Sequence, residues 1–111
     1  MGGLLISCAD SKKSKMPISE LTSVDLENAV LLDVRTPEEF AEGHLEGAVN
    51  MDWYQANFAK QLEAIGKGDK VYVYCKKGGR SAEAANLMDS LGYKKVVDLA
   101  GGYDAWLEFK D

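Results

Sequence analysis

Residues 71–89 read VYVYCKKGGRSAEAANLMD, and this stretch decides the fold because it holds a strand, a loop and a helix in succession. The apolar run 71–75 lacks the polar alternation of a half-exposed strand, which indicates a strand buried on both faces. After two glycines, apolar residues recur at helical spacing from Arg80 onward, with Gly92 in the stop position. We therefore predict a buried strand that leads through a glycine-bearing loop into a helix. The inner side of this helix is predicted to carry Ala84, Ala85, Leu87, Met88 and Leu91.

Strand and helix signals alternate along the rest of the chain. The run 30–35 reads as another buried strand, and Thr36, Pro37 and Glu39 form the capping pattern of a helix that ends near Gly43. The remaining predicted elements are a helix over 24–29, a strand over 47–51, a helix over 53–65 capped by Asp52, a strand over 95–99 and a helix over 103–109. Strands that alternate with helices predict an α/β domain with a central parallel sheet of about five strands and helices on both faces.

The composition fits one folded domain. The chain has 111 residues, of which 46% are hydrophobic and 28% charged, and these values are close to those of ordinary globular proteins. Its net charge of -5 argues against sequence-independent binding to nucleic acid, which needs a basic surface. No stretch approaches the roughly 18 apolar residues that a membrane-spanning helix requires. We expect a polar N-terminal tail over residues 1–15 and a domain without a membrane span over residues 16–111.

The N-terminal tail contains one suggestive pattern. Residues 4–8, LLISC, resemble the end of a bacterial lipoprotein signal, in which a small residue precedes a lipidated cysteine. The basic start and the apolar segment that normally precede such a site are missing. On this pattern we predict a bacterial envelope or periplasmic protein with a lipid anchor at Cys8 in its native form, and a cytoplasmic protein is the alternative.

The segment 75–81, CKKGGRS, places a thiol beside three cations at the carboxyl end of a strand, where ligands bind in sheets of this kind. A glycine-bearing loop and a helix start turn several backbone N–H groups toward one point, and the helix dipole adds positive potential. We expect Cys75 to ionise readily there and to act as a nucleophile. The alternative is that Cys75 is a small buried apolar side chain, which is the commoner role of a cysteine in a strand.

Residues outside this loop add little chemistry. Asp33 and Arg35 follow another predicted strand and are expected to border the same pocket. The alternative for Arg35 is a structural ion pair with Glu38 or Glu39. His44, the only histidine, would be the base in a cysteine-histidine mechanism, but its place in a turn favours a structural role. One histidine and two distant cysteines form no recognisable metal site, so we expect no metal and no other cofactor.

Three motifs together resemble the rhodanese-like domain family. Residues 31–50, LLDVRTPEEFAEGHLEGAVN, are similar to the family's N-terminal signature, and CKKGGRS is similar to its active-site loop. Residues 99–106, LAGGYDAW, match its C-terminal signature, and we interpret the tyrosine and tryptophan of this motif as core residues. The resemblance covers about residues 17–109. It implies a parallel-sheet α/β fold in which a cysteine accepts sulfane sulfur.

The activity that this resemblance implies is that of a thiosulfate sulfurtransferase with a persulfide on Cys75. Sulfur would pass from thiosulfate or a related donor to cyanide or a thiol, and a protein acceptor is also compatible. Backbone N–H groups of the loop would hold the outer sulfur, and the loop's cations would attract the donor's oxyanion. The implied substrate-binding residues are Lys76, Lys77, Gly78, Gly79, Arg80 and Ser81.

The length of the loop bears on the type of chemistry. Four residues separate Cys75 from Arg80, a spacing that resembles sulfurtransferases, whereas the related dual-specificity phosphatases carry one more residue to enclose a phosphate. The resemblance therefore favours sulfur transfer. A second reading is a persulfide carrier or docking module in a protein sulfur relay, with little activity on thiosulfate. A catalytically idle domain is disfavoured by the intact Cys75.

Overall fold

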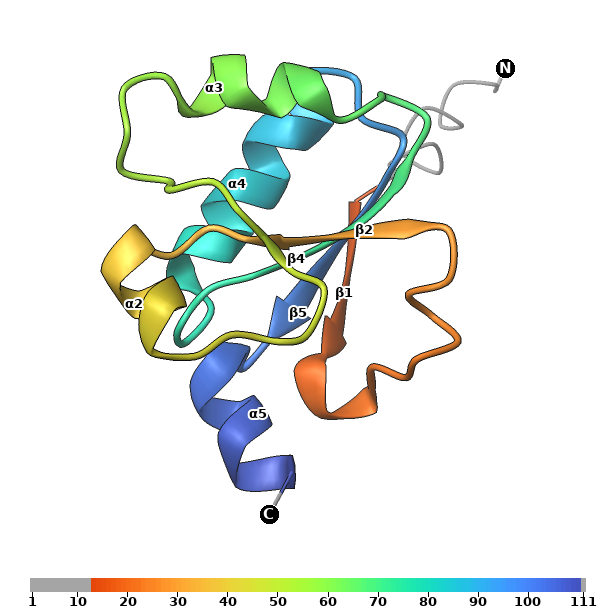
Figure 1. The fold of residues 1–111 in the computed structure, drawn as a ribbon. Helices are drawn as coiled ribbons and strands as arrows, with labels where there is room; N and C mark the ends of the chain where they lie inside the picture. The colour runs from red at the N-terminus through yellow and green to blue at the C-terminus, as the bar shows by residue number, and fades with distance from the viewer. Residues whose placement is uncertain (1–12, 111) are drawn as a thin grey trace.

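The computed structural model describes residues 13–110, and the structural statements below refer to those residues (Figure 1). Most of the predicted tail, including the predicted lipid anchor at Cys8, lies outside them. The elements in chain order are β1 (Lys13–Pro17), the 3-10 helix η2 (Ile18–Glu20), β2 (Ala29–Asp33), α2 (Pro37–Glu42), β3 (Val49–Asn50), α3 (Phe58–Gln61), the 3-10 helix η3 (Leu62–Ala64), β4 (Lys70–Tyr74), α4 (Gly79–Ser90), β5 (Lys95–Ala100) and α5 (Gly102–Lys110).

The strands form one parallel sheet of five strands in the order β1-β5-β4-β2-β3. This confirms the α/β fold that the alternating pattern predicted. Asp33 of β2 pairs with Tyr74 of β4, and Val73 of β4 pairs with Asp98 of β5. Because the strands are parallel and in this register, the chain leaves β2, β4 and β5 at the same edge of the sheet.

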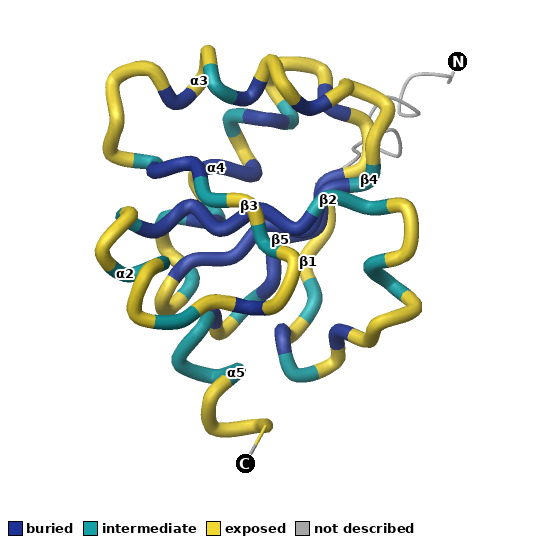
Figure 2. Tube along the Cα trace, in the orientation of Figure 1, coloured by how far each residue is buried: buried dark blue, intermediate teal, exposed yellow. Residues whose placement is uncertain are grey.

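Helices cover both faces of the sheet. On one face, α3, η3 and α4 pack on the alternate strand residues that include Val71 and Val73. On the other face, η2 and α5 pack on the residues between them, which include Tyr72 and Tyr74. The central strands β2, β4 and β5 are accordingly buried along most of their length, whereas β1 at the edge of the sheet is largely exposed (Figure 2). The last residues of β4 therefore lie buried between the two layers of helices.

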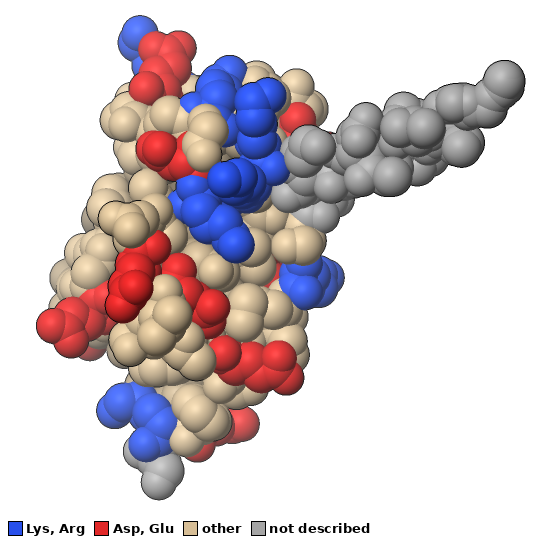
Figure 3. Space-filling model, turned by 90° about the vertical axis from the view of Figure 1, so that its right-hand side faces the viewer, with Lys and Arg blue, Asp and Glu red and all other residues tan. Residues whose placement is uncertain are grey.

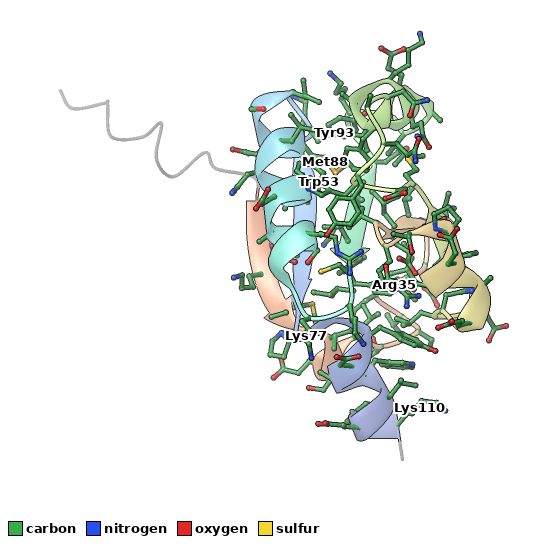
Figure 4. The ribbon with its side chains drawn as sticks, turned by 90° about the vertical axis from the view of Figure 1, so that its left-hand side faces the viewer. Arg35, Trp53, Lys77, Met88, Tyr93 and Lys110 are labelled. Carbon is green, nitrogen blue, oxygen red and sulfur yellow. The ribbon has the colours of Figure 1, made fainter. Side chains whose placement is uncertain are left out.

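Helix α4 has the inner side that its sequence predicts, except at its end. Ala84, Ala85 and Met88 are fully buried, and Leu87 packs partly against the same core. Figure 4 shows Met88 in the space between α4 and the segment that leads into α3. Leu91 was wrongly predicted to be buried: the helix ends at Ser90, and Leu91 is 37% exposed in the capping turn.

Strand β1 was not predicted from the sequence. Residues 13–15 were assigned to the polar tail, yet they form a strand that pairs with β5. This strand lies at the edge of the sheet, where polar residues and a proline such as Pro17 are tolerated. The position of the boundary between tail and domain otherwise stays a prediction.

Two predicted helices are wrong in type or length. Residues 24–29 form consecutive turns closed by bonds to the third residue back, and Asn28 adopts a left-handed φ of 58°, which a continuous helix does not allow. Over 53–65, only Phe58–Gln61 is α-helical, followed by a 3-10 turn. The Asp52 carboxylate accepts the N–H of Tyr54, two residues on, so it forms a local turn instead of capping a helix.

Candidate active site

The loop after β4 wraps around a buried thiol. Cys75 is 1% exposed, and the chain reverses at Gly78, whose φ of 128° is a conformation that residues with a side chain rarely adopt. Gly78 is the N-cap residue of α4, so the first turn of that helix begins at Gly79, four residues after Cys75. The end of the strand, the glycine turn and the start of the helix therefore meet at one sulfur atom.

The sulfur of Cys75 has two polar neighbours from this turn. The backbone N–H of Gly78 donates a hydrogen bond to Cys75 Sγ across 3.0 Å, and Ser81 Oγ lies 3.6 Å from the same sulfur. The Ser81 hydroxyl donates to Asp98 Oδ1 across 2.7 Å. Asp98 belongs to β5 and is buried, so the sheet itself holds the hydroxyl in place.

The three cations of the loop are each paired with a carboxylate from another helix. Lys76 Nζ and Lys77 Nζ lie 3.0 Å and 2.8 Å from the two oxygens of Asp104, in the first turn of α5. Arg80 makes a two-pronged bond to Glu39 of α2, with nitrogen-oxygen distances of 2.8 Å and 3.1 Å. In Figure 4, Lys77 lies where the loop meets α5.

These pairs shift the pKa values of the groups involved. The hydrogen bonds from Arg80 lower the pKa of Glu39 to about 2, against an opposing effect of burial. Hydrogen bonds from Lys77 and Lys76 lower the pKa of Asp104, and the bond to Asp104 raises the pKa of Lys77. Glu39, Asp104 and Lys77 are therefore charged near neutral pH.

Arg35 is paired with Asp33, so the predicted alternative of an ion pair with Glu38 or Glu39 is wrong. Both side chains are buried, and Arg35 Nη2 lies 2.7 Å from Asp33 Oδ2. The same nitrogen donates to the carbonyl oxygen of Gly43 across 2.6 Å, which ties the end of α2 to the sheet.

A pocket of about 380 Å³ lies beside the loop, between α2 and α5. Arg35 lines this pocket, and its guanidinium lies 4.4 Å from the centre of the Tyr103 ring. Asp33, which was also expected at the border of the pocket, is fully buried and is not among the residues that line it. The pocket is lined by Arg35, Glu39, Glu42, Lys76, Tyr103, Asp104 and Leu107.

The comparisons with known proteins agree with this geometry. The sequence model of the rhodanese-like domain matches residues 20–109 of the chain. The chain belongs to the rhodanese-like domain family. The matched part of this rhodanese-like domain contains β2 to β5, the Cys75 loop and nearly all of α5.

Several relatives of this rhodanese-like domain have been described. Thiosulfate sulfurtransferase 16, chloroplastic, from Arabidopsis thaliana is 39% identical over an alignment of 85 positions, which covers 68% of this chain and 71% of that protein. The putative sulfur carrier protein YrkF of Bacillus subtilis is 32% identical over 80 residues, which are 72% of this chain and 42% of that protein. The crystal structure of a rhodanese-related protein from Thermoplasma volcanium has a TM-score of 0.75 and 26% identity, covering 86% of this chain and 91% of that one.

His44 lies in the loop after α2, against Phe40. The His44 ring stacks on Phe40 with 3.7 Å between ring centres, and its Nδ1–H donates to the Phe40 carbonyl oxygen. His44 therefore has the structural role that the sequence favoured. Among residues 13–110 no group of three histidine, cysteine or acidic side chains is placed to hold a metal ion. Within the same range no helix has the length and hydrophobicity to cross a bilayer.

Three acidic residues of the site were not predicted: Glu39, Asp98 and Asp104. Glu39 was read as a capping residue, which it also is, because it accepts from Thr36 as well as from Arg80. Asp98 is an acidic residue that follows two valines in a predicted buried strand, and this pattern could have identified it as a residue with a buried polar partner. Asp104 stands between two residues taken as core, and no sequence signal connects it with lysines that lie more than 25 residues earlier.

Proposed function

We propose that the protein is a sulfurtransferase that carries sulfane sulfur as a persulfide on Cys75. The observation that carries this proposal is the bond from the Gly78 N–H to Cys75 Sγ, which aims one backbone dipole of the loop at the sulfur. A backbone donor at this point stabilises negative charge on a thiolate or a persulfide. Membership of the rhodanese-like family and the similarity to a thiosulfate sulfurtransferase from Arabidopsis support the proposal.

The first half-reaction uses thiosulfate as the donor. The Cys75 thiolate attacks the sulfane sulfur, the S–S bond of thiosulfate breaks, and its electron pair leaves with sulfite. The product is a persulfide on Cys75. Because an S–S bond is about 2 Å long, the transferable sulfur stands farther out from the buried Sγ, within the loop.

The second half-reaction returns the enzyme to its starting state. Cyanide or a thiolate attacks the outer sulfur of the persulfide, the S–S bond breaks, and the electron pair returns to Cys75 as thiolate. The product is thiocyanate or a new persulfide. The loop's N–H groups hold the outer sulfur, and Arg80, Lys76 and Lys77 attract the donor's oxyanion while the donor binds.

A second function is a persulfide carrier that exchanges sulfur with a protein partner and uses thiosulfate poorly. Two observations favour it. The thiol is 1% exposed, and the cations that would draw a free anion are already paired with Glu39 and Asp104. The similarity to a putative sulfur carrier protein of Bacillus subtilis agrees with this alternative.

Intact mass spectrometry after incubation with thiosulfate tests the proposal. The wild-type protein should gain the mass of one sulfur atom, and Cys75→Ser should gain none. Cys8→Ser is the matched control, because it removes the only other cysteine and should leave the gain unchanged. A wild type that takes up no sulfur from any sulfane donor, or a gain that depends on Cys8, contradicts the proposal. Steady-state formation of thiocyanate then separates the enzyme from the carrier.

A further inference from the structure

A single carboxylate is paired with both lysines of the active-site loop. The two oxygens of Asp104 lie 3.0 Å from Lys76 Nζ and 2.8 Å from Lys77 Nζ. The lysine side chains are 49% and 76% exposed, and Asp104 is 32% exposed. Exposed ion pairs of this kind add little to the stability of the fold. The negative charge of Asp104 nevertheless lies beside the loop.

The backbone fixes Asp104 at this position. The N–H of Tyr103 donates to the Cys75 carbonyl oxygen across 2.8 Å, and the N–H of Asp104 donates to the Lys76 carbonyl oxygen across 3.0 Å. The first turn of α5 is therefore bonded directly to the residues that begin the loop. The backbone of Asp104 cannot move away from the loop without breaking these bonds.

With Glu39 on Arg80, the three positive charges of the loop are opposed by two negative charges. A donor oxyanion must compete with Asp104 for the ammonium groups of Lys76 and Lys77, and the negative charge of Asp104 also repels it. This repulsion grows in proportion to the donor's own charge. It is twice as large for thiosulfate, a dianion, as for a monoanionic donor of the same size.

We propose that Asp104 is a specificity-determining residue that disfavours dianionic sulfur donors relative to donors of lower charge. This inference rests on the proposed function, because it concerns the donor that loads Cys75. It identifies the charge of the donor as the property against which Asp104 discriminates. Asp104 does not touch the sulfur and takes no part in bond breaking.

Two small donors of nearly equal shape make this inference testable. Thiosulfate and methanethiosulfonate differ in that a methyl group replaces one oxygen, which lowers the charge from two to one. Both transfer one sulfur to the Cys75 thiolate; the first releases sulfite and the second releases methanesulfinate with the electron pair of the broken S–S bond. The ratio of their kcat/KM values therefore measures how strongly the enzyme discriminates between donors by their charge.

Asp104→Asn is the decisive variant, since asparagine keeps the shape and removes the charge. For a charge on the order of 8 Å from the donor in a water-like dielectric, kcat/KM should rise about fivefold for thiosulfate and about twofold for methanethiosulfonate. The rise should appear mainly as a lower KM and should shrink as NaCl screens the charge.

Two control variants accompany it. Asp104→Glu keeps the charge and should keep the wild-type ratio between the donors. Glu63→Gln removes a carboxylate that is also paired with a lysine, Lys60. Glu63 precedes β4 in the chain, so it lies toward the opposite edge of the sheet from Cys75. This variant should leave both donors unchanged.

The possible failures are distinguishable. An equal rise for both donors, or no change for either in an Asp104→Asn protein whose wild type is active, overturns the role of Asp104 and leaves the sulfurtransferase proposal intact. A wild type that is inactive with both donors overturns the sulfurtransferase proposal, and the role of Asp104 falls with it.

Discussion

The carboxylate of Glu39 joins two elements that are far apart in sequence. It accepts two hydrogen bonds from Arg80 of α4 and also closes the capping box at Thr36 of α2. Its side chain is 26% exposed, so water screens the charge only in part. Hydrogen bonds to a charged group at such a site are stronger than those between neutral groups.

The lowered pKa of Glu39 predicts how stability changes with acid. The folded-state pKa of about 2 lies below its ordinary value of 4.5, so the carboxylate stabilises the fold above about pH 4.5. This contribution is lost as the pH falls through about 2, when the folded carboxylate takes up a proton. Glu39→Gln should therefore reduce the free energy of unfolding by about 1–2 kcal/mol at pH 7 and by little at pH 2.

Urea denaturation at several pH values measures this difference. Glu38→Gln is the matched control, because the exposed neighbouring carboxylate makes no bond to Arg80. The control should follow the wild type throughout. A constant difference between Glu39→Gln and the wild type from pH 7 to pH 2 would mean that the Arg80 bond does not depend on the charge of Glu39.

At the level of residues, the sequence located the nucleophile but not the charges around it. The position of Cys75 follows from local features, namely an apolar strand, two glycines and a helix start. The partners of its cations come from other parts of the chain: Glu39 from α2 and Asp104 from α5. Tertiary structure alone brings them to the loop, so no local pattern identifies them.

At the level of elements, α5 begins unusually close to the active-site loop. Gly102, its first residue, has a φ of 65°, and a Cβ atom placed there would overlap the carbonyl groups of Lys76 and Cys75. The absence of a side chain allows Tyr103 to bond to the Cys75 carbonyl. This is the physical reason for the second glycine of the Gly-Gly pair.

Gly102→Ala should therefore lower the free energy of unfolding by about 2–3 kcal/mol and slow the loading of sulfur onto Cys75. The strained φ and the overlap both contribute. Gly47→Ala measures the cost of the strained φ alone, because Gly47 has a similar φ of 87° but open space where its Cβ would lie. Chemical denaturation and the rate of persulfide formation measure the two effects. Equal losses in both variants would mean that the overlap with the loop has no cost.

Elements with strong local signals were predicted correctly, and those shaped by tertiary packing were not. Strands β2, β4 and β5 are buried on both faces, so their apolar runs identify them. The segment 53–65 has apolar residues at helical spacing, and Phe58, Leu62 and Ile65 are indeed buried. It forms only a short helix because Asp52 and Tyr54 make a turn before it.

At the scale of the whole molecule, charge is unevenly distributed. Although the chain is acidic overall, Figure 3 shows a patch of lysine and arginine side chains in the upper half of the side that it displays, besides others that stand apart from it. Lys70 and Lys95 stand at the amino ends of β4 and β5 and are direct neighbours in the sheet. They lie at the edge opposite to Cys75, so this positive charge does not serve the active site.

Placing two lysines side by side on adjacent strands should cost stability at low salt. Lys95→Gln is expected to raise the free energy of unfolding by about 0.5 kcal/mol, because like charges on paired strands repel. The gain should vanish near 1 M NaCl, where the screening length falls to about 3 Å. Lys60→Gln makes the same change in net charge but removes the partner of Glu63, so it should not stabilise. Urea denaturation at both salt concentrations checks this, and a gain in Lys60→Gln equal to that in Lys95→Gln would point to net charge instead of the strand pair.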